Sequence, residues 1–260
     1  MSKPKLHIIK IGGNVIDHEE NLSSFLVDFS KLEGLNILVH GGGKKATEIA
    51  KKLQLEPKMI GGRRITDADN LEVVTMVYAG LLNKNIVANL QKNNCNAIGL
   101  SGADGNAIKA HKRIVKEIDY GFAGDVDEVD TNTISVLLEN NLIPVFCAIT
   151  HNKEGQLLNT NADTIASELA SGLAKKYEVS LTYIFEKKGV LESIDDEDSV
   201  IESIDSEMYE TLKNNNIIAA GMLPKLENCF YALSRGVAEI HIANSDFITN
   251  KNTQHTTLSL

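Results

Sequence analysis

The chain has 260 residues, of which 43% are hydrophobic and 23% are charged, which is the composition of a folded globular protein rather than a disordered one. Asp and Glu number 35 against 26 Lys and Arg, which gives a formal charge of −9. A surface this acidic would repel a phosphate backbone, so the composition argues against a general nucleic-acid binder.

No apolar run is long enough to cross a membrane. The longest, such as residues 142–149, are far shorter than the roughly 20 residues that a bilayer requires. The first apolar run ends at Lys10, too early for a signal peptide. Three widely spaced cysteines (Cys95, Cys147 and Cys229) form no CxxC pair or His/Cys cluster, so we expect buried free thiols. The sequence predicts a cytoplasmic protein without a membrane partner.

Short runs rich in Ile, Val and Leu alternate along the chain with amphipathic stretches. The runs expected as buried strands are 6–11, 36–40, 96–100, 142–149, 179–185 and 239–243. The stretches expected as helices, with apolar residues three and four positions apart, are 22–32, 44–53, 131–140, 161–176 and 223–235. This alternation indicates an α/β fold in which helices cover both faces of a mostly parallel central sheet, an αβα sandwich.

Three further segments stand out. Residues 68–92 predict a long helix with a wide apolar stripe, which either packs wholly inside the core or lies partly against a partner. Residues 58–66 and 105–129 combine β-type runs with turn residues and predict hairpins that project from the edge of the sheet.

Two glycine loops follow predicted strands. Lys10 leads into Gly12-Gly13, and the strand at 36–40 leads into Gly41-Gly42-Gly43 and then a helix. Backbone N–H groups in such loops can approach a phosphate closely, although the same pattern also makes ordinary tight turns. Neither a GxGxxG nor a GxxxxGK[ST] sequence occurs, so dinucleotide and P-loop sites are disfavoured.

Three more sites carry charged residues beside turns. Arg64 follows a glycine pair and either clamps a carboxylate or lies in solvent. Asn161 has the pattern of a helix N-cap, which places Asp163 in the first turn, where it either stabilises the helix or holds lysines. Lys225 lies near the start of a late helix, where its charge opposes the helix dipole and calls for an anion such as phosphate.

The order of these motifs resembles the amino acid kinase family, specifically the members that phosphorylate N-acylglutamates. The motifs are strand-Lys10-x-Gly-Gly, His40-Gly-Gly-Gly, Gly62-x-Arg64-x-Thr66, Ser101-Gly-x-Asp104-Gly, Asn159-x-Asn161-Ala-Asp163 and Gly221-Met-x-x-Lys225, and the resemblance covers residues 6–243. It implies a single kinase domain over 1–260, whose N-terminal lobe, about 1–160, binds the acylglutamate and whose C-terminal lobe, about 161–260, binds ATP with Mg²⁺.

The resemblance also implies roles for individual residues. Lys10 and Lys225 would flank the transferring phosphoryl group as catalytic residues, with Asp163 orienting both. Gly42, Gly43, Arg64 and Asn159 would bind the acylglutamate. ATP would contact Gly12, Gly13, Glu186, Gly189, Val190, Leu191, Ile217, Ile218, Ala219 and Gly221. No protein-held metal is implied, because ATP phosphates and water would hold most of the magnesium.

The implied reaction is ATP-dependent phosphorylation of the γ-carboxylate of N-acetyl-L-glutamate in arginine biosynthesis. Alternatives are a kinase for another N-acylglutamate such as N-succinylglutamate, another amino acid kinase that acts on glutamate, aspartate, carbamate or a nucleoside monophosphate, and a non-catalytic regulator that binds a nucleotide or amino acid. The chain departs from the family at the expected adenine site, where residues 185–190 read Phe-Glu-Lys-Lys-Gly-Val and Glu186 would replace an Asp.

Assembly is a further expectation. In the resembling family, arginine-inhibited members carry an extra helix ahead of the first strand, and only residues 1–5 precede that strand here. We therefore expect an arginine-insensitive homodimer, formed through the wide apolar stripe of residues 68–92.

Overall fold

The computed structural model describes residues 2–193, 195–214 and 222–260. Within these ranges eight strands form a central sheet in the order β12-β14-β13-β11-β1-β2-β8-β5. Their bounds are β1 Lys5–Ile11, β2 Leu35–His40, β5 Ala97–Leu100, β8 Ile143–Cys147, β11 Glu178–Ile184, β12 Ser203–Ile204, β13 Glu239–Ala243 and β14 Thr256–Leu258. Neighbouring strands run parallel except β13 with β14. The predicted α/β sandwich with a mostly parallel sheet is confirmed.

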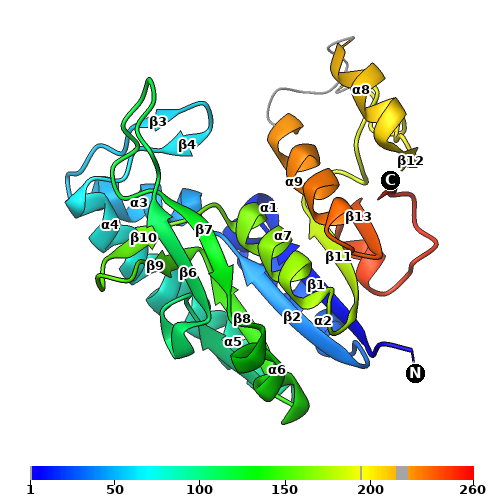
Figure 1. The fold of residues 1–260 in the computed structure, drawn as a ribbon, viewed down its shortest axis with the longest axis horizontal. Coiled ribbons are helices and arrows are strands. Elements are labelled where there is room, and N and C mark those ends of the chain that lie inside the picture. Colours follow the sequence, from blue (N-terminus) through cyan, green and yellow to red (C-terminus); the bar gives the residue numbers. More distant parts are fainter. Residues whose placement is uncertain (1, 194, 215–221) are drawn as a thin grey trace.

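Helices cover both faces of this sheet, which is why its central strands are apolar along their length. On one face α7 (Ala162–Leu173) packs over β1, β2 and β11, with α9 (Leu223–Ser234) beside it. On the other face, which lies behind the sheet in Figure 1, α2 (Glu19–Phe29) packs against α5 (Asn83–Lys92). Two shorter helices, α1 (Gly13–Asp17) and α3 (Gly43–Lys52), begin directly after the two glycine loops.

A second, four-stranded sheet has the order β10-β9-β6-β7. It consists of β6 (Ile108–Lys112), β7 (Gly124–Val129), β9 (Ile149–His151) and β10 (Leu157–Asn159). The prediction of one strand over 142–149 was wrong, because the chain leaves the central sheet after Cys147 and pairs with β10 from Ile149 on. The apolar run continues across this change of sheet, so its pattern could not reveal the break.

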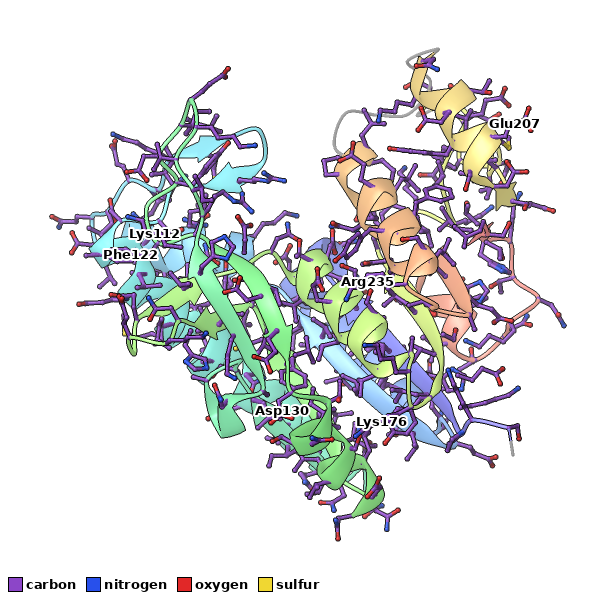
Figure 2. All side chains as sticks on the ribbon, viewed as in Figure 1. Lys112, Phe122, Asp130, Lys176, Glu207 and Arg235 are labelled. Atoms are coloured by element: carbon purple, nitrogen blue, oxygen red, sulfur yellow. The ribbon has the colours of Figure 1, made fainter. Side chains whose placement is uncertain are left out.

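Both predicted hairpins exist. β3 (Met59–Ile60) pairs with β4 (Arg63–Arg64), and β6 pairs antiparallel with β7, the latter as part of the second sheet. The Lys112 ammonium lies 5.4 Å from the centre of the Phe122 ring, a contact between the end of β6 and the segment just before β7 (Figure 2).

The predicted long helix is continuous but not uniformly α-helical. Asp67 caps it by accepting a hydrogen bond from the backbone N–H of Asn70 at 2.9 Å. α4 (Ala68–Thr75) then passes into a π-helical segment, η1 (Met76–Leu82), before α5 begins. Such a segment contains an extra residue and turns the side chains that follow it onto a different face.

The remaining helices are α6 (Thr131–Glu139) and α8 (Ser206–Asn214), with short 3₁₀ turns η2 (Asp104–Asn106) and η3 (Ser245–Ile248). Asp130 caps α6 by accepting from the N–H groups of Asn132 and Thr133, and Lys176 donates to the Asn132 side chain at 2.7 Å (Figure 2). The end of α7 is thereby tied to the start of α6. None of the helices described is long and apolar enough to span a bilayer.

Candidate active site

A cavity of about 550 Å³ opens beyond the carboxyl ends of β1 and β2. In parallel α/β sheets ligands bind at this edge, where strands give way to loops. The cavity is lined by both glycine loops, the β3–β4 hairpin, Tyr78 of η1, the β6–β7 connection and the turn that leads from β10 into α7. With Ala148, between β8 and β9, seven separate segments among the described residues converge on one space.

Asp163 lies between two lysine ammonium groups. The Lys10 Nζ is 2.7 Å from its Oδ1, and the Lys225 Nζ is 2.7 Å from its Oδ2. The side chains of all three residues are at most 19% exposed, so water screens their charges weakly. Lys10 comes from the end of β1 and Lys225 from the first turn of α9, so this cluster joins elements that are remote in sequence.

Local structure fixes the position of Asp163. Asn161 caps α7, as predicted, by accepting from the backbone N–H groups of Asp163 and Thr164 at 2.8 and 3.2 Å. The Tyr183 hydroxyl donates to the Asp163 carbonyl at 3.1 Å. The position of Lys225 at a helix N-terminus predicted a nearby anion. The Asp163 carboxylate supplies one.

The charges of the cluster shift one another's pKa. Burial alone would raise the pKa of the Asp163 carboxyl, but attraction to Lys10 and Lys225 outweighs burial and holds that pKa well below its usual range. Burial and the charge of Lys225 lower the pKa of Lys10, while Asp163 opposes this shift. The three side chains together carry one net positive charge, and the carboxylate of Glu186 also acts on Lys10 by raising its pKa.

Two glycines are required by close contacts around the loops. A Cβ at Gly12 would lie 2.5 Å from the Lys10 Nζ, so a side chain there would displace the ammonium group. A Cβ at Gly42 would lie 2.2 Å from Cδ1 of Leu82, and Gly42 has a φ of +146°, which favours glycine. Gly43 begins α3 and lines the same cavity.

Arg64 is buried with one nitrogen unpaired. Its Nη2 donates to the Gly43 carbonyl at 3.0 Å and to Oγ1 of Thr47 at 2.6 Å. Its Nη1 is buried without a hydrogen-bond partner among the described residues, although the residue lines the cavity. An unsatisfied guanidinium N–H is costly, which makes this nitrogen a candidate donor to a carboxylate. The neighbouring Arg63 also lines the cavity and is exposed.

Asn159 is oriented by a buried threonine. Its Nδ2 donates to Oγ1 of Thr66 at 2.9 Å, and Thr66 is fully buried. Thr66 itself is anchored by backbone hydrogen bonds to Tyr120 and Phe122 at 3.0 and 2.7 Å. With one amide hydrogen of Asn159 engaged, its Oδ1 remains as an acceptor for a ligand N–H.

The residues predicted to bind ATP are placed unevenly. Gly12 and Gly13 line the cavity, and a Cβ at Gly13 would lie 3.8 Å from the Glu186 carboxylate, so Glu186 borders the cluster. Gly189 and Val190 instead pack against Thr256, whose Oγ1 accepts from the Val190 N–H at 2.8 Å. Leu191 bridges to Val200. Gly189, Val190 and Leu191 do not line the cavity.

Four of the predicted ATP residues, Ile217, Ile218, Ala219 and Gly221, lie outside the described residues. Several cavity residues were not predicted: Lys44, Thr47, Tyr78, Arg113 and Tyr120. Lys44 follows the third glycine of its loop, and that position was an available signal. Tyr78 and Tyr120 lie in segments whose local sequence gives no sign of a site, because only tertiary packing brings them here.

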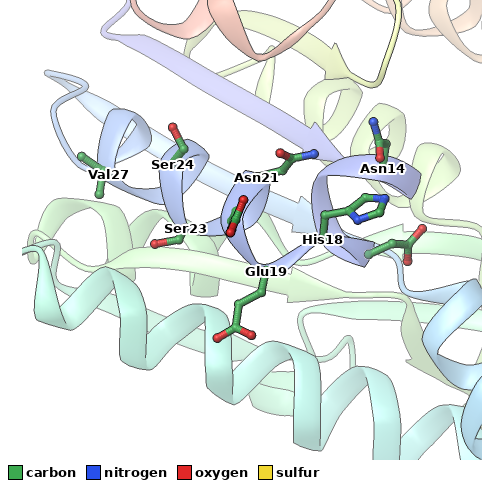
Figure 3. Close-up of a pocket in the computed structure, with 9 residues that line it drawn as sticks. Asn14, His18, Glu19, Asn21, Ser23, Ser24 and Val27 are labelled. Carbon is green, nitrogen blue, oxygen red and sulfur yellow. The ribbon is translucent and has the colours of Figure 1, made fainter.

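A second hollow runs along α1 and α2 (Figure 3). Asp17, Glu19 and Glu20 give its lining an acidic character, which would repel nucleotide phosphates and dicarboxylates. The Asp17 carboxylate lies 3.2 Å from the Lys44 Nζ, and Lys44 lines the first cavity, so the two hollows adjoin at this ion pair. The basic first cavity is the candidate site.

The described residues contain no group of three or more His, Cys, Asp or Glu side chains arranged to hold a metal ion. In the cluster itself, both oxygens of Asp163 face ammonium groups and are not free to ligate a cation.

Comparisons with known proteins identify the family of the chain. A profile of the amino acid kinase family matches residues 5–244. The chain is 54% identical over 243 residues to the acetylglutamate kinase of Cytophaga hutchinsonii, covering 93% of this chain and 92% of that one. Among solved structures it is similar to smu.665 from Streptococcus mutans, with a TM-score of 0.81 and 28% identity over 98% of both chains.

A carbamate kinase from Giardia lamblia, bound to AMP-PNP, shares the fold with a TM-score of 0.72 and 16% identity over 100% of this chain and 99% of that one. The family resemblance carried by the ordered motifs is thereby confirmed. The chain belongs to the amino acid kinase family.

Proposed function

We propose that this protein transfers the γ-phosphoryl group of ATP to the γ-carboxylate of N-acetyl-L-glutamate, giving N-acetylglutamyl 5-phosphate and ADP for arginine biosynthesis. The observation that carries the proposal is the Lys10–Asp163–Lys225 cluster at the edge of the cavity, with 2.7 Å between each ammonium and the shared carboxylate. Identity of 54% to an acetylglutamate kinase over nearly the whole chain supports the choice of substrate.

The cluster suits phosphoryl transfer because that reaction depends on positioning and on cations. Negative charge spreads over the equatorial oxygens of the transferring group, and two flanking ammonium groups would stabilise it. Asp163 fixes both lysines before the substrates arrive, so little reorganisation is needed during the reaction. ATP arrives with Mg²⁺, which neutralises charge on its phosphates as part of the substrate.

The acceptor needs no general base. A γ-carboxylate has an ordinary pKa near 4 and is already ionised at neutral pH. Arg64 would bind the α-carboxylate through its unpaired Nη1, and Asn159 would accept from the amide N–H of the substrate through Oδ1. Gly42 and Gly43 would supply backbone donors from the loop that ends β2. The γ-carboxylate would then point toward the cluster.

For ATP we propose contacts near the cluster with Gly12 and Gly13, in the loop that follows β1, and with Glu186, which follows β11. Gly189, Val190 and Leu191 would act indirectly, by supporting the segment that follows β11. We place the enzyme in the cytoplasm, where ATP is the phosphoryl donor and where three free, buried cysteines remain reduced.

One observation favours a longer acyl group as a second candidate. Arg63 and Arg113 also line the cavity, in addition to Arg64. Asp125 pairs with Arg113 through both carboxylate oxygens, whereas Arg63 is exposed and has no ion pair within the described ranges. This extra cation would suit an acyl cap that ends in a carboxylate, as in N-succinylglutamate.

The experiment is an ADP-release assay on a substrate panel. N-acetylglutamate should support turnover, whereas N-acetylglutamine, which has the same acyl and α-carboxylate groups but no γ-carboxylate, should not. A kcat/KM for N-succinylglutamate above that for N-acetylglutamate would select the second candidate. Absence of turnover with every N-acylglutamate would refute both and leave a kinase for a different substrate or a non-catalytic binding protein.

A further inference from the structure

A buried polar cluster lies directly behind the glycine loop that follows β2, residues 41–43. It contains His40, the last residue of β2, and Asn83, the first residue of α5, and the two are 0% and 1% exposed. The His40 Nδ1 lies 2.9 Å from the Gly41 carbonyl oxygen, and its Nε2 lies 3.1 Å from the Asn83 Nδ2. Neither residue belongs to the roles assigned above.

The contacts fix which atoms donate. The Lys84 ammonium, which can only donate, lies 3.2 Å from Oδ1 of Asn83. The NH2 group of the Asn83 side chain therefore points away from Lys84. That amide donates to the Val145 carbonyl at 2.9 Å and to Nε2 of His40. Nε2 is therefore an acceptor, and the hydrogen of the neutral ring is on Nδ1, which donates to the Gly41 carbonyl.

The surrounding structure holds the Asn83 side chain in this one position. A Cβ at Gly99 would lie 1.9 Å from Oδ1 of Asn83, so the glycine in β5 leaves room for the amide. Asn83 directly follows the π-helical segment, and loss of the residue that such a segment adds would turn Asn83 by about 100° around the helix axis. Burial lowers the pKa of His40 to about 4, which keeps the ring neutral as the hydrogen bonds require.

The consequence appears on the other side of the Gly41–Gly42 peptide. In a trans peptide the C=O and N–H groups point in opposite directions, and all described peptide bonds are trans. With the Gly41 carbonyl held toward the buried ring of His40, the Gly42 N–H is directed the opposite way. Gly42 itself lines the cavity.

We propose that His40 and Asn83 are positioning residues that hold the Gly42 N–H toward the bound acyl substrate and the transferring phosphoryl group. Neither touches the substrate, since both are buried behind the loop. The effect on catalysis rests on the proposed kinase function, whereas the effect on the loop itself does not. Fixing an amide donor before substrate binds is the form of electrostatic stabilisation that a phosphoryl-transfer site needs.

Two substitutions of His40 separate the two sides of its ring. His40→Asn places an amide nitrogen near the position of Nδ1 and retains the donor to Gly41. His40→Gln reaches toward Asn83 and loses that donor. We expect kcat to fall about 10-fold or more in His40→Gln and in Asn83→Leu, while His40→Asn stays within about 3-fold of the parent enzyme. Val39→Ala, in the same strand but without a polar role, controls for loss of core packing.

Amide hydrogen exchange over residues 41–45 of the unliganded protein supplies the readout that does not depend on activity. We expect faster exchange in His40→Gln and Asn83→Leu than in Val39→Ala, and parent-like exchange in His40→Asn. If exchange and kcat in His40→Gln match Val39→Ala, the positioning role is wrong even though the kinase proposal stands. If no variant, including the parent, is a kinase but the exchange pattern holds, the proposed function fails and the loop-positioning role survives.

Discussion

Asp163 and Lys225 are 62 residues apart in sequence, and their side chains meet at 2.7 Å. Asp163 lies in the first turn of α7, the helix that packs over β1, whereas Lys225 lies in the first turn of the neighbouring helix α9. The contact between these two helices therefore determines the distance between the carboxylate and the ammonium group. Lys10 reaches the same carboxylate from β1, so the site depends on the packing of a helix pair on the sheet.

Removing the Lys225 ammonium should impair the chemical step more than substrate binding. We expect Lys225→Ala to lower kcat by about 100-fold or more, with little change in the KM for the acyl substrate, because the ammonium acts on the transferring group. Steady-state ADP release at saturating ATP measures both constants. Lys175→Ala removes an exposed lysine after α7 and should leave both unchanged. A raised KM with an unaltered kcat in Lys225→Ala would contradict this role.

Asp163→Asn should destabilise the protein in a pH-dependent manner. The folded state lowers the pKa of this carboxyl, so its ionised form contributes stability above its unfolded pKa near 4 and that contribution is lost as pH falls. We expect the parent protein to exceed Asp163→Asn in unfolding free energy at pH 7 and this difference to shrink toward pH 3.5. Urea unfolding at both pH values provides the test. A difference that grows as the pH is lowered has the wrong sign for this pairing.

Arg64 should govern affinity for the acyl substrate. We expect Arg64→Ala to raise the acyl-substrate KM by about 10-fold or more and to leave the ATP KM nearly unchanged, because only the α-carboxylate would contact Nη1. Arg64→Lys should restore little, since one ammonium cannot bond Thr47, Gly43 and a ligand with the geometry of a guanidinium. Initial-rate measurements with each substrate varied in turn decide the matter. An equal rise in both KM values would argue for a general loss of structure.

Burial of neutral His40 should reduce stability in mild acid. Its folded pKa is about 4 against 6.5 for the unfolded chain, so between these values only the unfolded state binds the proton. The parent protein should therefore lose about 3 kcal/mol relative to His40→Asn between pH 7 and pH 4. Paired unfolding curves across this range measure the relative change. A constant difference between the two proteins would show that His40 titrates normally in the folded state.

The long helix offers a test of assembly. Met76 and Leu81, in its π-helical segment, are 54% and 43% exposed, which is unusual for large apolar side chains on one helix. We propose that a second copy of the chain covers them, so sedimentation should give a dimer for the parent and a monomer for Leu81→Glu. Val136→Glu, at an apolar position on α6 that is 57% exposed, should remain dimeric. A monomeric parent, or a dimeric Leu81→Glu, would exclude this interface.

The fold was predictable because local patterns determine it. Alternating apolar runs and amphipathic stretches located six of the strands and the main helices to within a few residues, and the Asn161 cap followed from residue type alone. The break between β8 and β9 was not predictable, because residues 142–149 are apolar on both sides of it. The π-helical segment was not predictable either, because no pattern in its own residues distinguishes it from an α-helix. Its last residue, Leu82, packs against Gly42 of the glycine loop, and that contact is tertiary.

The candidate site was predictable where its residues lie in ordered motifs. Lys10, Asp163 and Lys225 converge in the structure, and Arg64 and Asn159 line the same cavity. The hydrogen bond between His40 and Asn83 was not predictable. It joins residues 43 positions apart, and no sequence pattern identifies His40 as the partner of the Asn83 side chain. The contact of Gly189 with Thr256, where a Cβ would lie 2.5 Å from Oγ1, likewise joins residues remote in sequence and has no local signal.

The most direct measurement is product trapping. Purified protein is incubated with ATP, Mg²⁺ and N-acetyl-L-glutamate in the presence of hydroxylamine, which converts an acyl phosphate into a stable hydroxamate. We predict N-acetylglutamyl γ-hydroxamate in amounts equal to the ADP released, and a rate lower by at least about 100-fold in Lys10→Ala/Lys225→Ala. ADP release without hydroxamate would contradict phosphoryl transfer to the γ-carboxylate. Equal hydroxamate formation by the parent and the double variant would contradict the role of the two lysines that flank the transferring group.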